Sequence, residues 1–249
     1  AWADLNRTIQ SNLADAMGTR SEFGGNQAGT SVNTTPVAIN SESDQIAEAV
    51  SKADRLDLKG AEARHYDVEM LARQFGASFE QTAHRLTTLQ KPGAECVPFF
   101  FIRVDPAGNV SKRLDGAGFP FARHGGACPL WSVHQVFRTP RQIVTQWLEL
   151  PDGSRFFSIA RTVTAGGGAF GSVRVERAIA LGCAAEHAGR LVYTQAQPAL
   201  TPDTATPIGV TCRLCHRTQC TARSAPPIGR DMLPDDYRRA SAPFGFSDA

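Results

Sequence analysis

The sequence predicts an α+β fold, with N-terminal helices followed by an antiparallel sheet of about five strands, flanking helices and a Cys-rich C-terminal metal-binding segment. Three observations lead to this prediction. Apolar residues recur at helical spacing before residue 90, they alternate with a period of two between Val97 and Leu181, and thiols concentrate between Cys212 and Cys220.

Residues 1–60 are expected to contain two helices and a linker. Residues 2–17 carry apolar side chains at helical spacing, and another helical pattern starts near Ser43. Residues 18–40 are rich in Gly, Asn, Ser and Thr and have few large apolar side chains, which predicts a linker. We therefore interpret residues 1–60 as a helical and linker region.

Residues 67–89 predict a pair of helices. Gly76 ends the first helix, and Ser78-Phe-Glu-Gln81 is a capping-box sequence that starts the second. The pair has the shape of a helix-turn-helix, but acidic residues outnumber basic ones over residues 61–90, whereas DNA-recognition helices sit on basic surfaces. The charge therefore favours an ordinary helix pair packed on the core over a pair that contacts DNA.

Alternating apolar residues and turn residues predict five strands in the following part of the chain. Two hairpins turn at Asp105-Pro-Ala-Gly-Asn109 and at Pro151-Asp-Gly153, and Gly166-Gly-Gly168 precedes the fifth strand. The predicted strands are residues 99–104, 110–114, 144–150, 155–163 and 172–181. A stretch rich in Pro and Thr, residues 198–207, then leads to the cysteine segment.

The composition is ordinary for a globular protein, with 42% hydrophobic and 20% charged residues. A formal net charge of +2 predicts no strong attraction to nucleic acid or membranes, and no apolar run approaches the roughly 20 residues of a membrane span. The N-terminal residues show no secretory signal, and six cysteines are too few for a disulfide scaffold in 249 residues. We therefore expect a protein of the reducing cytoplasm with no membrane partner.

The strongest chemical signal is the string Cys212-Arg-Leu-Cys215-His-Arg-Thr-Gln-Cys220, together with Cys183 upstream. Thiolates are soft ligands that suit zinc and iron–sulfur clusters, and four of them complete the coordination shell of either. The window from Pro207 to Arg230 has no acidic residue. Its four arginines, which would offset the charge of a thiolate-bound metal, are Arg213, Arg217, Arg223 and Arg230. The spacing does not choose between zinc and iron–sulfur, and a reactive dithiol or buried cysteines are the remaining alternatives.

The other two cysteines, Cys96 and Cys128, are solitary in the sequence, so each is interpreted as a small buried hydrophobe. A nucleophilic role for Cys128 with His124 or His134 as its base lacks a third orienting residue. The sequence therefore does not favour catalysis at Cys128.

The segment 119–134 is rich in glycine and aromatic residues and predicts a ligand pocket. Glycines allow close backbone approach, aromatic side chains provide apolar walls, and basic side chains nearby in sequence could reach phosphates. The candidate ligand-binding residues are Lys112, Arg113, Phe121, Trp131, His134 and Arg138. A glycine-rich loop that only packs on the sheet is an equal alternative.

Several unusual strings occur in a recognisable order. They include Tyr66-Asp-Val-Glu-Met-Leu-Ala-Arg-Gln-Phe-Gly76, Val97-Pro-Phe-Phe-Phe-Ile-Arg-Val-Asp105, Gly125-Gly-Ala-Cys-Pro-Leu-Trp131 and Ile208-Gly-Val-Thr-Cys212-Arg-Leu-Cys215. Over residues 62–246 the chain resembles the C-terminal region of the short-chain acyl-CoA-responsive transcription regulators of the PrpR and RamB type.

Members of that family combine an XRE-type DNA-binding helix-turn-helix, a domain related to ImmA/IrrE peptidases and this C-terminal region. The resemblance implies that residues 61–92 are the end of the ImmA/IrrE-like domain and that residues 93–249 are the C-terminal sensor domain with the Cys cluster. Residues 1–60 do not match the family, so DNA is expected to be contacted only through an upstream helix-turn-helix that is not evident in this chain. No His-Glu-x-x-His motif supports peptidase activity.

The resemblance also implies a function and its ligands. It implies a module that is not an enzyme, that senses CoA or a short-chain acyl-CoA to control propionate and short-chain fatty-acid genes, and that forms a homo-oligomer. It implies a 4Fe-4S cluster, with zinc as the alternative, on Cys183, Cys212, Cys215 and Cys220. The competing interpretation is a zinc-stabilised structural or interaction module without a small-molecule effector.

Overall fold

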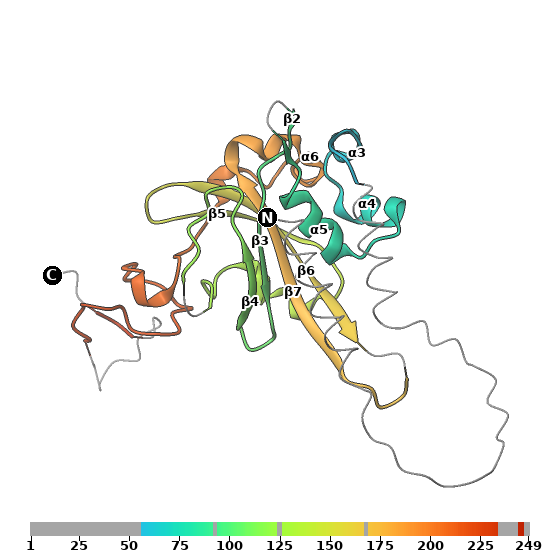
Figure 1. Ribbon diagram of the computed structural model, residues 1–249. Helices are drawn as coiled ribbons and strands as arrows, with labels where there is room; N and C mark the ends of the chain where they lie inside the picture. The colour runs from blue at the N-terminus through green and yellow to red at the C-terminus, as the bar shows by residue number, and fades with distance from the viewer. Residues whose placement is uncertain (1–55, 92–93, 124–125, 167–168, 234–243, 247–249) are drawn as a thin grey trace, which may run out of the picture. The chain divides into compact units, whose positions relative to one another are not determined.

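The computed structural model describes residues 56–91, 94–123, 126–166, 169–233 and 244–246 (Figure 1). The helix expected over residues 2–17, the linker over 18–40 and the helix from Ser43 lie outside the described residues. All described residues belong to one unit, Ser41–Ala249. No helix among them is long and apolar enough to cross a membrane.

Three short helices open the described chain: α3 (Leu58–Ala63), α4 (Val68–Phe75) and α5 (Phe79–Thr87). The predicted helix pair is confirmed. Gly76, at φ 62°, ends α4 in the left-handed region, and Ser78 makes both hydrogen bonds of the capping box with the third residue of α5.

Both helices of the pair pack on the sheet. Their apolar faces enter its core, and two ion pairs join helix to strand. Arg161 of the sheet meets Glu69 of α4 at 2.9 Å, and Arg103 meets Glu80 of α5 at 2.6 Å. This packing agrees with the interpretation of residues 67–89 as an ordinary helix pair.

The sheet contains the five predicted strands and a sixth that the sequence did not predict. The strands are β3 (Phe100–Val104), β4 (Val110–Leu114), β5 (Val144–Glu149), β6 (Arg155–Gly166), β7 (Arg174–Ala184) and β8 (Thr206–Pro207). Within the described residues their order is β4-β3-β7-β6-β5-β8. The expectation of a purely antiparallel sheet is therefore wrong, because β8 pairs parallel to β5 at the edge.

The remaining described elements are short. They are a two-stranded ribbon of β1 (Gln90–Lys91) and β2 (Ala94–Glu95), the helix α6 (Val192–Gln195), and the 3₁₀ turns η1 (Ser132–His134), η2 (Val136–Arg138), η3 (Ala185–Arg190), η4 (Pro202–Thr204) and η5 (Cys212–Leu214). The described chain after Ala184 therefore contains only short elements.

The sheet separates two hydrophobic clusters. Helices α4 and α5 cover one side, and the C-terminal segment lies on the other (Figure 1). Side chains alternate along β7, so that Ile179 and Leu181 enter the helix-side cluster, whereas Ala178 and Ala180 enter the cluster around Trp131. The position of a residue on β7 therefore decides which cluster it joins.

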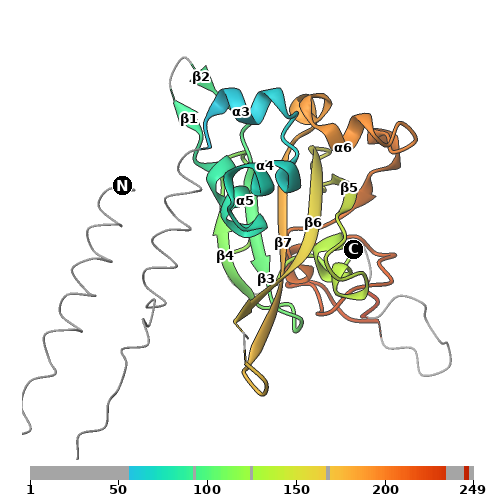
Figure 2. The same ribbon diagram turned by 90° about the vertical axis from the view of Figure 1, so that its right-hand side faces the viewer.

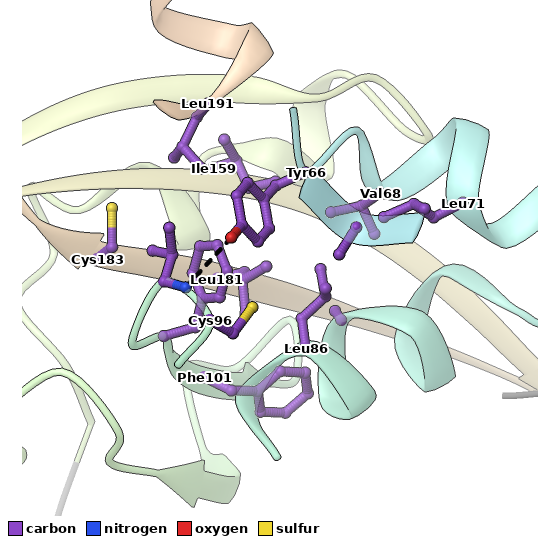
Figure 3. Packing of buried hydrophobic residues seen from close by; sticks show 14 of the residues in the cluster. Tyr66, Val68, Leu71, Leu86, Cys96, Phe101, Ile159, Leu181, Cys183 and Leu191 are labelled. Atoms are coloured by element: carbon purple, nitrogen blue, oxygen red, sulfur yellow. Dashed lines mark hydrogen bonds between the residues drawn. The ribbon is translucent and has the colours of Figure 1, made fainter. Parts of the chain in front are cut away.

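Tyr66 anchors the helical region to the sheet cluster (Figure 3). Its hydroxyl accepts hydrogen bonds from the Val97 amide at 3.4 Å and from Arg190 Nη2 at 3.0 Å. His65 and Tyr66 both adopt positive φ angles, 47° and 58°, and the His65 carbonyl accepts the Val192 amide at 2.9 Å. The helix pair, which precedes residue 92, and the sheet, which follows it, consequently share one hydrophobic core.

Gly182 provides a test of this packing, because it lies on β7 between Phe100 of β3 and Ser158 of β6. A Cβ atom at this position would lie 2.7 Å from the Phe157 carbonyl oxygen and 2.8 Å from Phe100 Cε1. We predict that Gly182→Ala lowers the free energy of unfolding by about 1–3 kcal/mol, because the paired backbone cannot move away. Chemical denaturation measures the loss. Gly189→Ala, where nothing lies within 4 Å, is the control, and equal stability of the two variants would contradict this packing.

Candidate metal centre

The Cys-rich segment begins directly after β8. The Ile208 amide donates to the Glu149 carbonyl of β5 at 2.9 Å and thereby ties the start of the segment to the sheet. The turn η5 then begins with Cys212. The side chains of Cys212 and Cys215 are buried, and that of Cys220 is half-buried.

A buried arginine organises the cysteine segment from within. Arg223 is only 4% exposed, and its Nη1 donates to the carbonyls of Cys212 at 3.2 Å and Cys215 at 3.0 Å. Its Nη2 donates to the Arg217 carbonyl, and its guanidinium lies 4.9 Å from the centre of the Phe246 ring. One side chain therefore holds three points of the segment in a fixed arrangement.

The sulfur of Cys212 accepts two hydrogen bonds. The Ser224 amide donates to Cys212 Sγ at 3.4 Å, and the Ser224 hydroxyl donates to it at 3.3 Å. Hydrogen bonds of this kind stabilise a thiolate and tune a metal bound to it. The Cys212 sulfur thus lies where two donors would stabilise its thiolate form.

Cys128 joins this group from the loop before η1. Burial is the main cause that raises the pKa of Cys128, the backbone of Gly209 and Leu130 lowers it, and the nearby Cys212 and Cys220 raise it. On Gly209 itself, a Cβ atom would lie 2.9 Å from Cys215 Sγ. Gly209 therefore lies beside Cys215 and Cys128, and Cys128 in turn lies near Cys212 and Cys220.

Cys183 does not join the group. It is fully buried on β7 opposite Phe157 and belongs to the helix-side cluster with Tyr66 and Leu181 (Figure 3). Burial raises the pKa of Cys183 to about 12, which keeps its sulfur protonated. The structure thus places Cys128 near Cys212 and Cys220, and places Cys183 in the cluster on the other side of the sheet from Cys128.

The four neighbouring cysteines do not form a closed single-ion site. Within the described part of the chain, no three His, Cys, Asp or Glu side chains converge as a group that could hold a metal ion. The segment does offer soft sulfurs, two hydrogen bonds to one of them and a buried guanidinium, which are features that a thiolate-bound group uses.

The predicted ligand residues are divided between several places. Arg113, Phe121 and Trp131 line one cavity on the Cys128 side of the sheet, but it leaves only about 10 Å³ of free space, room for about one water. The rings of Phe100 and Phe119, 4.4 Å apart, fill much of this region. The aromatic residues thus serve as core in this structure.

The other three predicted ligand residues lie elsewhere. Lys112 lies on the opposite side of the sheet, where burial and then Arg103 lower its pKa. Burial also lowers the pKa of His134, and its Nε2 is buried without a hydrogen-bond partner. Arg138 is exposed at the end of η2. The structure therefore does not bring the six residues into one pocket.

A larger cavity, of about 330 Å³, adjoins the cysteine segment and was missed by the sequence. One wall is the end of β5 and the β5–β6 turn, with Glu149 and Pro151, and the other is the loop that carries His216 and Arg217. Arg217 Nη2 donates to the Glu149 carbonyl at 3.2 Å, while its Nε is buried without a partner. The only sequence signal for this cavity is the excess of arginines in the window 207–230.

Residues 88–244 match the family described as short-chain fatty acyl coenzyme A regulator, C-terminal. The chain belongs to this family. It is 48% identical over 188 residues to the propionyl-CoA carboxylase regulator of Cereibacter sphaeroides, which covers 76% of this chain and 40% of that protein. These findings confirm the predicted resemblance.

Two Mycobacterium tuberculosis proteins match at 40% identity. They are the HTH-type transcriptional regulators PrpR, over 76% of this chain and 39% of the relative, and RamB, over 94% and 48%. A solved structure of a Mycobacterium tuberculosis transcriptional regulator matches with a TM-score of 0.70 and 41% identity, over 76% of this chain and 57% of that one. The chain therefore spans less than half the length of these curated relatives.

Arg223 generates a prediction about the order of the cysteine segment. Arg223→Ala leaves the carbonyls of Cys212 and Cys215 without their charged donor, and each such bond contributes about 1.5–3 kcal/mol. We expect amide hydrogen exchange over residues 212–220 to accelerate about tenfold or more, as followed by mass spectrometry. Arg213→Ala removes an exposed side chain from the same segment and should leave exchange unchanged. Equal exchange in both variants would contradict the role of Arg223.

Proposed function

We propose that this chain is the effector-sensing module of a bacterial transcription regulator that controls genes of propionate and short-chain fatty acyl-CoA metabolism. The module carries an iron–sulfur cluster and responds to CoA or a short-chain acyl-CoA. Its relatives carry the names of transcription regulators, and one is named for propionyl-CoA carboxylase. Under this proposal, a helix-turn-helix outside this chain recognises DNA in the cytoplasm.

The nearness of Cys128 to Cys212 and Cys220, with Cys215 beside Gly209, carries the metal part of the proposal. Cys128, Cys212, Cys215 and Cys220 would hold the cluster, so Cys128 takes the place that the sequence suggested for Cys183. This choice is supported by the sheet between Cys183 and the other three, and by the interactions of Cys128 with Cys212 and Cys220. A zinc ion on the same thiolates is the alternative.

A bound cluster would supply a covalent cross-link between the cysteine segment and the Cys128 loop, and one that responds to oxygen and redox state. The protein residues transmit the state of that link. Arg223 joins the carbonyls of Cys212 and Cys215 to that of Arg217, and Arg217 reaches Glu149 on β5. Loosening the cysteine segment therefore loosens one wall of the 330 Å³ cavity.

That cavity is the place we propose for the effector. Its volume falls at the lower end of the range for small-molecule sites, whereas the aromatic cavity near Trp131 is filled. Arg217 and His216 line it, and a guanidinium is a group that binds an anionic oxygen well. An effector bound there would favour one arrangement of the segment over another.

The ligand set is tested by anaerobic purification of variants, followed by absorption spectra and by iron, sulfide and zinc analysis. We expect Cys128→Ser to lose the cluster, because a weaker ligand replaces one corner, and Cys183→Ala to keep it, because Cys183 is core. Loss in Cys183→Ala with retention in Cys128→Ser would return the site to the set suggested by sequence. A colourless protein with stoichiometric zinc would establish the alternative metal.

The effector is tested by thermal unfolding with propionyl-CoA. At about 100 times its dissociation constant, a ligand of the folded state stabilises by about 2.7 kcal/mol, which raises the melting temperature by about 5–10 °C at this chain length. His216→Ala should reduce the rise, while the control His187→Ala, beside Glu186 on η3, should not. No rise in the cluster-loaded wild-type protein would refute effector binding by this chain.

A further inference from the structure

The β6–β7 ribbon extends beyond the rest of the sheet (Figure 2). On one side, pairing with β5 stops at Ala160 of β6, and on the other, pairing with β3 stops at Ala178 of β7. The two strands continue to pair with each other as far as Gly166 and Arg174. The end of the ribbon is consequently a two-stranded arm, and such an arm is at best marginally stable alone.

The outer edge of β7 in this arm is free within the described structure. Residues 174–177 have no strand on the side where β3 pairs further along, so alternate backbone groups on that side are unpaired. Val173 is 79% exposed and Val175 is 40% exposed, and Phe170 at the tip is fully exposed. An exposed apolar edge strand is a template for another strand.

We propose that this edge pairs antiparallel with the same edge of a second copy of this chain, across a two-fold axis at Val175. Closed two-fold dimers are the commonest oligomers, and their interfaces use one patch twice. The proposal concerns an assembly surface, and it does not depend on the metal or effector assigned above.

The charge pattern of the edge is complementary to itself in this register. With Val175 opposite the partner's Val175, each Arg174 lies opposite the partner's Glu176, and this pair occurs twice. Opposite charges in directly facing positions stabilise antiparallel pairs. Within its own ribbon, Arg174 faces Gly166 and Glu176 faces Thr164, so neither has a charged cross-strand neighbour there.

The apolar pattern agrees with the charge pattern. Val173, Val175 and Arg177 share the face of β7 that continues into Ile179 and Leu181 of the helix-side cluster. In the proposed pair, Val173 lies opposite the partner's Arg177, whose aliphatic stem can cover it. Pairing therefore extends an existing apolar face across the two-fold axis.

Charge favours a second copy over nucleic acid as the occupant of the arm. The described arm residues from Ser172 to Arg177 carry two arginines and one glutamate, a net charge of +1. A ribbon that tracks phosphates needs a strongly basic surface. The alternating signs match a copy of the same edge instead.

Sedimentation velocity of the full chain over a concentration series tests the proposal. We expect a reversible dimer. Arg174→Glu and Glu176→Arg should each weaken it about tenfold or more, because each sets like charges opposite one another at two places. The double variant Arg174→Glu/Glu176→Arg should restore wild-type affinity, because it recreates both pairs with their signs exchanged.

Arg73→Glu, a charge reversal at an exposed position on α4, is the matched control and should leave the dimer unchanged. Circular dichroism checks that each variant is folded. A monomeric wild-type chain, or a dimer indifferent to both single changes, would overturn the proposal. If the double variant dimerises no more tightly than the single variants, the proposed register at Val175 is overturned.

Discussion

Both faces of β7 are buried along its central part, so the apolar side chains there enter one of two cores. The large side chains of Ile179 and Leu181 meet the helices, while the small Ala178 and Ala180 leave room for the ring of Trp131 on the other side. Gly182 lets β3 and β6 approach closely. This division also decides which thiols can meet, because a sulfur that points to the helices cannot reach the cysteine segment.

The two-residue alternation of apolar side chains, together with local turn and cap residues, made most of the fold predictable. Alternation and turn residues located the five strands, and Gly76 and Ser78 located the helix pair, because these signals act over a few residues. The strand β8 was not predictable, since Thr206 and Pro207 become a strand only through the edge of β5. Its two residues carry no alternation of their own.

The candidate site was predictable only in part. The spacing of Cys212, Cys215 and Cys220 marks a loop that can present several sulfurs, and in the structure Cys212 and Cys220 both lie near Cys128. Whether Cys128 or Cys183 completes the group depends on the side of the sheet along which the C-terminal segment runs. The path of the C-terminal segment is set by the topology of the fold. Neither the identity nor the spacing of the cysteines determines that path. The same applies to Arg223, whose burial follows from the path of the loop around it.

The anchor at Tyr66 has a consequence for how the protein is made. The Tyr66 hydroxyl is bonded by Arg190, 124 residues later, and the Val68 amide by the Tyr193 hydroxyl, 125 residues later. At roughly 5–20 residues per second of synthesis, the ribosome needs roughly 6–25 s to supply these partners. Until then the apolar face of α4 has no completed site to fold into. The helix pair can therefore join the core only after the later strands have emerged from the ribosome.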